Sequence, residues 1–214
     1  MENLNLVLPE IFISLSIMFL LVLGVFKKDS SKLIFNISLL VLLITATITL
    51  NETSNINRTT LFNNSVVIDY MSSLMKIITL VGAFLVLVIS SNYLKIFKIF
   101  KIEYPILILS SVLGMMVMIS SNDLMVFYIG LELQSLALYV LATFNRDQLK
   151  SSEAGLKYFV LSALSSGLLL YGCSLIYGFS GSTNFDIISN QLNSTNYVLT
   201  FGIVFILVGL AFKI

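Results

Sequence analysis

The chain contains no histidine and a single cysteine among its 214 residues. The absence of histidine excludes histidine-ligated haem, histidine-rich metal sites and histidine proton shuttles. Cys173 is alone and lies within an apolar run, so neither a disulfide nor a cysteine-cluster metal site can form within the chain. Any proton chemistry must therefore use Glu, Asp, Lys or Tyr side chains.

Charge is also scarce. Only 11% of the residues are charged, whereas roughly a quarter are charged in an average soluble domain. Hydrophobic residues make up 57% of the chain, and they fall in long blocks. This composition predicts an all-α membrane protein whose main surroundings are the lipid bilayer. We expect no nucleic-acid partner.

Seven stretches are long enough to cross a hydrocarbon core of about 30 Å, which takes about 20 helical residues. About seven transmembrane helices are therefore predicted. The stretches are Leu6–Phe26, Leu33–Leu50, Tyr70–Asn92, Tyr104–Ser120, Leu124–Phe144, Ala154–Phe179 and Tyr197–Ile214.

Basic residues concentrate in alternate loops. The loops after the second, fourth and sixth helices together contain one basic residue, Arg58. By the positive-inside rule, the basic loops face the cytoplasm and the N-terminus lies on the other side. The basic loops, after the first, third and fifth helices, contain Lys27, Lys28 and Lys32; Lys95, Lys98 and Lys101; and Arg146 and Lys150.

Several local features have structural interpretations. The Asn- and Thr-rich segment at 51–65 is expected to be a solvated connector. Asn122 or Asp123 can cap the fifth helix, because a short side-chain acceptor satisfies free backbone N–H groups there. In the sixth helix, small residues recur four positions apart, which favours close helix packing. These pairs are Ser162 with Ser166 and Ala163 with Gly167.

Glu132 is the most unusual charge. It lies eight residues into the fifth helix, about 12 Å from its start, and a charge near the bilayer centre costs roughly 2.5–3.5 kcal/mol. Tyr128, Glu132, Ser135 and Tyr139 share one helix face and form a polar stripe that should face protein or water. A protonated structural glutamate remains an alternative, but we favour a functional role.

Other charges have simpler explanations from the residues alone. Lys213 follows an apolar run and is interpreted as a helix-end lysine that extends toward the interface. Lys76, near Asp69 in the first turns of the third helix, is also expected to extend outward. Glu10 suits the first turn of a helix because of the helix dipole.

Lys157 follows Glu153 by four residues in the sixth helix. An exposed ion pair near the membrane surface and a site at a proton entry are about equally compatible with this spacing.

Two consecutive segments closely resemble subunit N of the proton-pumping NADH–quinone oxidoreductase, respiratory complex I. They are LGMMVMISSNDLMVFYIGLELQSLALYVLATFNRD and, after it, SSEAGLKYFVLSALSSGLLLYG. The run GLELQSLALYVLA is its most specific part. The opening LPEIF and the ending VGLAFKI are similar to the N-terminus and the seventh helix of that family. The resemblance covers essentially the whole chain.

The resemblance implies roles for three residues. Glu132 matches a glutamate that pairs with a lysine in a broken seventh helix, and Lys213 matches that lysine, near the middle of the membrane. Lys157 matches a lysine along the proton path.

The family fold has about fourteen helices with two inverted repeats. The chain would thus be the first part of an antiporter-like inverted-repeat fold, truncated at 214. Residues 1–103 would form three helices, and 104–214 an incomplete first repeat.

The resemblance also implies a function: a proton-translocating, non-redox membrane-arm subunit in a bacterial inner membrane. The partners would be other membrane-arm subunits of complex I. NADH, FMN, iron–sulfur clusters and quinone would bind to partner subunits, with no cofactor in this chain, and the isolated chain is not expected to be active. Two alternatives remain: a subunit of a multi-subunit cation/proton antiporter, and a non-transporting scaffold or assembly protein.

Overall fold

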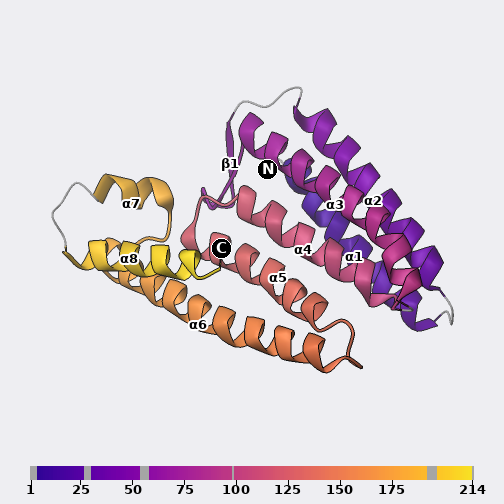
Figure 1. The fold of residues 1–214 in the computed structure, drawn as a ribbon. Coiled ribbons are helices and arrows are strands. Elements are labelled where there is room, and N and C mark those ends of the chain that lie inside the picture. The colour runs from indigo at the N-terminus through magenta and orange to yellow at the C-terminus, as the bar shows by residue number, and fades with distance from the viewer. Residues whose placement is uncertain (1–3, 27–29, 54–57, 98, 192–196, 214) are drawn as a thin grey trace.

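The computed structural model describes residues 4–26, 30–53, 58–97, 99–191 and 197–213, and it is built almost entirely of helices (Figure 1). Lys27, Lys28 and Lys98 of the basic loops, and Ile214, lie outside these residues. A short 3-10 turn, Leu4–Val7, leads into the first helix. The helices are α1 (Leu8–Phe26), α2 (Ser31–Thr53), α3 (Tyr70–Ile96), α4 (Glu103–Ile119), α5 (Leu124–Ala142), α6 (Leu149–Ser180), α7 (Phe185–Gln191) and α8 (Tyr197–Ala211).

The predicted membrane helices are all present, with different lengths. Among the described residues, five helices are long and apolar enough to cross a membrane, while α4 and α8 are shorter apolar helices. Helix α6 begins at Leu149, five residues before the predicted start. Its first turns are rich in Lys, Ser and Glu, so hydropathy alone does not mark them as helical. The all-α membrane fold is confirmed; the boundary between residues 103 and 104 stays a prediction.

The first four helices share one apolar core. Ile13, Leu20, Leu42, Leu87 and Leu109 are among its fully buried members. Figure 1 shows α1, α2 and α3 grouped on one side, with α4 between them and α5. A second core joins α5, α6 and α8.

Helices α4 and α5 approach each other closely at two glycines. A Cβ atom on Gly114 would lie 2.6 Å from the backbone nitrogen of Gln134, and one on Gly130 would lie 2.8 Å from that of Met118. Side chains at these positions would push the backbones apart, so the two glycines set the distance between the helices.

Helices α6 and α8 are also in close contact, but at different residues from those predicted. A Cβ atom on Gly172 would lie 2.7 Å from the Gly202 carbonyl oxygen, and one on Gly209 would lie 2.8 Å from the Leu169 Cβ atom. Ser162 and Ser166 are buried as their pairing predicts. Ala163 and Gly167 are both exposed, and a Cβ atom added to Gly167 would meet no atom of another described element within 4 Å, so this pair makes no close helix contact here.

The segment predicted to be a solvated connector contains a β hairpin. Strands β1 (Thr59–Leu61) and β2 (Val66–Ile68) pair antiparallel. Phe62, Asn63 and Asn64 have positive φ angles in the turn between them. The hairpin is anchored because Val67 N donates to the Ser120 carbonyl and Asn122 N donates to the Ser65 carbonyl, each at 2.8 Å. It therefore fixes the connection between α4 and α5.

Helix α7 and the polar contacts around it were not predicted from the sequence. The Asn122 side-chain amide donates to the Asn64 carbonyl and to the Asp186 carboxylate, each at 3.0 Å. Asn184 accepts from Asp186 N at 3.0 Å through its side-chain oxygen. These bonds join the hairpin, the start of α5 and the start of α7 at the same end of the molecule.

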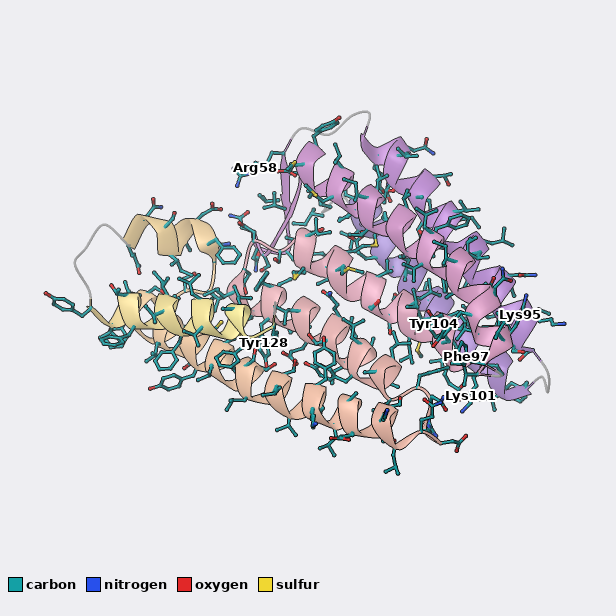
Figure 2. All side chains as sticks on the ribbon, in the orientation of Figure 1. Arg58, Lys95, Phe97, Lys101, Tyr104 and Tyr128 are labelled. Atoms are coloured by element: carbon teal, nitrogen blue, oxygen red, sulfur yellow. The ribbon has the colours of Figure 1, made fainter. Side chains whose placement is uncertain are left out.

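The two ends of the helices differ in charge. Figure 2 shows Lys95 and Lys101 at one end and Arg58 at the opposite end. This separation is what the alternation of basic loops requires, because each helix reverses the direction of the chain. The end with Lys95 and Lys101 is called the basic end below, and the other the hairpin end. Which end faces the cytoplasm stays a prediction.

Candidate ion-pair site within the membrane helices

The start of α5 is fixed by Asp123. Of the two predicted caps, Asp123 has this role: its carboxylate accepts from Met125 N at 2.8 Å and from Val126 N at 3.4 Å. Its second oxygen accepts from the Thr183 hydroxyl, in the connection between α6 and α7. The cap therefore also fixes α5 relative to the end of α6.

The polar stripe on α5 faces protein, as its spacing predicts. Ser135 and Tyr139 are buried, and Tyr128 and Glu132 are partly buried. Tyr128 packs against the core formed by α5, α6 and α8 (Figure 2). The Tyr139 ring lies edge-on against Tyr158 of α6, with 4.8 Å between centroids. The Tyr139 hydroxyl is buried and has no hydrogen-bond partner among the described residues.

Glu132 and Lys213 form an ion pair within this stripe. Lys213 Nζ lies 2.6 Å from Glu132 Oε1, and the two side chains are 9% and 22% exposed. The Ser166 hydroxyl of α6 donates to the same carboxylate oxygen. Lys213 thus points toward α5 instead of extending along the membrane interface, and helices α5 and α6 and the turn after α8 all contribute to the site.

Contacts with α6 place Lys213 at this depth. The Ser165 hydroxyl donates to the Gly209 carbonyl at 2.7 Å, and Gly209 packs on the backbone of Leu169. Lys213 N then donates to the Leu210 carbonyl at 3.0 Å, in a turn after the last residue of α8. Ser166 lies seventeen residues after Leu149, about 25 Å along the 32-residue α6. The ion pair therefore lies about halfway along α6.

The part that Ser166 has in the site was not predicted from the sequence. Ser162 and Ser166 were expected to serve helix packing, and both do lie on the buried face of α6. The signal that could have found Ser166 is a hydroxyl on the apolar interior face of a helix next to one that carries a buried carboxylate. Such a carboxylate requires donors, and a neighbouring serine can supply one.

The structure does not bring Lys157 to the pair. Lys157 Nζ lies 2.6 Å from Glu153 Oε1, and the two side chains are 68% and 63% exposed. Lys157 precedes Ser166 by nine residues, about 13 Å along the helix. Its neighbour Tyr158, however, packs on Tyr139 of the polar stripe.

A second buried ion pair contradicts the prediction for Lys76. Lys76 Nζ lies 2.6 Å from Glu10 Oε1, with side chains 3% and 10% exposed. Lys76 therefore turns into the α1–α3 bundle instead of extending outward. Glu10 lies in the first turn of α1, as predicted, but it also neutralises a buried cation.

Comparison with known proteins identifies related sequences. Residues 121–214 match the family described as NADH:quinone oxidoreductase/Mrp antiporter, TM. The chain is 72% identical over its whole length to NADH-quinone oxidoreductase subunit N of Pelagibacter ubique, and 52% identical over 99% of its length to that of Bartonella bacilliformis. The chain belongs to the subunit N family. It covers 45% and 44% of these two subunit N proteins, so it spans a little under half their length.

A solved structure shares the fold. A chain in respiratory complex I from Thermus thermophilus with bound aureothin superposes with a TM-score of 0.77, at 24% identity, over 95% of this chain and 43% of the other. At this identity the likeness concerns the fold alone. This chain therefore has the fold of somewhat less than half of that longer chain.

The site is made of a carboxylate, an ammonium group and a hydroxyl group. Among the described residues, no group of three or more His, Cys, Asp or Glu could hold a metal ion. The site instead brings a carboxylate, an ammonium group and a hydroxyl together at one oxygen, Glu132 Oε1. In a low-dielectric region, such a set can hold charge only while its members stay in contact.

Proposed function

We propose that this chain is the proton-translocating part of a membrane-arm subunit of a bacterial NADH:quinone oxidoreductase. The observation that carries the proposal is the ion pair between Glu132 and Lys213, placed halfway along α6 and away from both helix ends. Buried charges in transmembrane segments are costly and mark ion pathways more often than they add stability. The membership of the subunit N family supplies the reaction to which such a pair would be coupled.

The proposed mechanism is electrostatic. While Lys213 stays at 2.6 Å, its ammonium charge stabilises the Glu132 carboxylate. If the lysine moves away, the carboxylate is left with Ser166 alone, and taking up a proton then removes the uncompensated charge. Movement of Lys213 would thus load and release one proton at Glu132. We assign Lys157 a role in bringing protons toward the stripe, supported by its neighbour Tyr158 packing on Tyr139.

The remaining chemistry belongs to other subunits in this proposal. NADH, FMN, iron–sulfur clusters and quinone would bind there, and their redox reactions would drive the movement of Lys213 through neighbouring membrane-arm subunits. The basic end would face the cytoplasm and the N-terminus the periplasm. Because the chain spans less than half of its relatives, we assign pumping to the full-length subunit within the complex.

The decisive experiment replaces Glu132 by Gln in the full-length subunit and measures NADH-driven proton uptake in membrane vesicles. We expect proton uptake per NADH oxidised to fall while the amount of assembled complex stays close to wild type. The matched control is Glu103→Gln, because Glu103 is exposed in the first turn of α4. Unchanged proton uptake in Glu132→Gln would contradict the proposal.

Two alternatives give different results in the same vesicles. A cation/proton antiporter subunit is favoured only by the shared family description, which includes the Mrp antiporter. The antiporter alternative predicts salt-dependent pH changes in the vesicles without NADH. A scaffold protein predicts that Glu132→Gln lowers the amount of complex but leaves proton uptake per complex unchanged.

A further inference from the structure

The ion pair between Glu10 and Lys76 lies in a different part of the molecule from Glu132 and is more deeply buried. It joins the first turn of α1 to α3, at the hairpin end of the helices. Lys76 lies six residues after Tyr70, about 9 Å into α3. Neither residue has a part in the function proposed above.

A third charge makes this group unbalanced. Glu52, in the last turn of α2, is partly buried and interacts electrostatically with both Glu10 and Lys76. Two carboxylates and one ammonium group leave a net charge of −1 when all three are ionised. One negative charge in the group is therefore not neutralised by its members.

Among the described residues, the other elements at this end either carry no positive charge or pair it with another acid. Helix α4 also packs on α1, and its segment from Gly114 to Ile119 contains no charged residue. Arg58 lies near Asp186, 3.9 Å away. Asp69 is an acid, and its carboxylate caps α3 by accepting from Ser72 N.

One carboxylate oxygen in the group has no partner among the residues that the structure describes. Glu10 Oε1 contacts Lys76, whereas Glu10 Oε2 is buried and has no hydrogen-bond partner among the described residues. A buried carboxylate oxygen without a donor is unfavourable, and binding a proton there removes the negative charge. The unpartnered oxygen and the excess charge thus independently indicate a place for one proton.

We propose that Glu10, Glu52 and Lys76 together hold one exchangeable proton, which enters from water at the hairpin end through Glu52. Glu52 is the partly exposed member, whereas Glu10 and Lys76 are buried. The step is a proton transfer from hydronium to a carboxylate oxygen: one O–H bond forms on the carboxyl group and one water is released. A hard metal cation fits less well, because it takes six or more oxygen ligands and Lys76 already occupies Glu10 Oε1.

Infrared difference spectra between acidic and alkaline pH would test this site. The sample is the resting complex assembled with the full-length subunit, without NADH. We expect a protonated-carboxyl C=O band in wild type, and its loss in both Glu10→Gln and Glu52→Gln, because either change leaves a neutral group with no excess proton. The lost intensity corresponds to about one carboxyl proton per complex.

Lys76→Met should change the C=O band in the opposite direction. Removing the ammonium leaves two carboxylates with no cation, so the C=O band should persist to higher pH than in wild type. A purely structural ion pair predicts no such opposition between the Gln and Met variants. Glu103→Gln, at the opposite end and exposed, is the control that should keep the band unchanged.

Two outcomes would overturn the proposal. One is an unchanged C=O band in Glu52→Gln, which leaves the Glu10–Lys76 pair intact and so does not depend on how well Glu10→Gln assembles. The other is a band that responds to sodium concentration at constant pH, which would make the occupant a monovalent cation. Because the complex is at rest, neither outcome depends on whether Glu132 and Lys213 translocate protons.

Discussion

The molecule contains two ion pairs of equal length in different surroundings. Both have a nitrogen–oxygen distance of 2.6 Å and join helices that are not neighbours in sequence. The Glu10–Lys76 pair is nearly inaccessible, and one of its carboxylate oxygens has no partner in the part of the chain that the structure describes. The Glu132–Lys213 pair is more accessible, and its acceptor oxygen has a second donor in Ser166.

Two ion pairs with the same nitrogen–oxygen distance can therefore differ in the free energy needed to open them. Breaking a pair is costly when the remaining charge has neither water nor another donor. Glu132 retains Ser166 and some exposure if Lys213 leaves, whereas Glu10 has neither advantage. The pair around Glu132 is thus better suited to opening, as the proposed transport cycle requires, and the pair around Glu10 to staying closed.

The largest effect should come from Lys76→Met. It leaves a buried carboxylate without its cation, which typically costs about 3–5 kcal/mol. Lys213→Met should be less destabilising, because Glu132 keeps the Ser166 hydroxyl and partial exposure. The temperature at which the solubilised complex loses its native-gel band measures both. Equal losses in the two variants would mean that burial does not distinguish the pairs.

Ser166→Ala should have an intermediate effect. It removes a hydrogen bond to a charged oxygen, which is worth about 1.5–3 kcal/mol, and leaves the ion pair in place. We expect a lower thermal midpoint and slower NADH-driven proton uptake. Ser174→Ala is the control, because the Ser174 hydroxyl donates to the Tyr171 carbonyl of its own helix. Identical proton uptake in the two variants would contradict a role for Ser166 in the site.

The smallest effect on stability should come from Lys157→Ala. An exposed pair four residues apart on a helix contributes about 0.3–0.5 kcal/mol, so the thermal midpoint should barely move. If Lys157 delivers protons to the stripe, proton uptake should nevertheless slow. Lys150→Ala, exposed in the first turn of the same helix, provides the comparison. Equal uptake in the two variants would leave Lys157 as a surface residue.

The helices and the polar stripe could be predicted because they depend on local periodicity. Apolar runs located all the membrane helices, and the spacing of Tyr128, Glu132, Ser135 and Tyr139 placed them on an interior face. The cap at Asp123 was predictable for the same reason, since its donors are two and three residues away.

The prediction for Lys76 was wrong because its partner is 66 residues away in sequence. Position in a helix shows how deep a lysine lies, but not which side chain faces it from another helix. The role of Ser166 required knowing that α5 and α6 bring its hydroxyl to Glu132. The hairpin was missed because its two strands have only three residues each, and its hydrogen bonds to the α4–α5 connection are long-range.

The contact between Ser165 and Gly209 has a mechanical consequence for α8. It fixes a pivot four residues before Lys213, so the arm that carries the ammonium group is about 6 Å long. Because Lys213 lies close to this contact, tilting α8 about it by a modest angle displaces the Lys213 backbone by only a small distance. If the pair opens as we propose, we expect the movement to come mainly from rotation of the flexible lysine side chain, while α8 stays docked on α6.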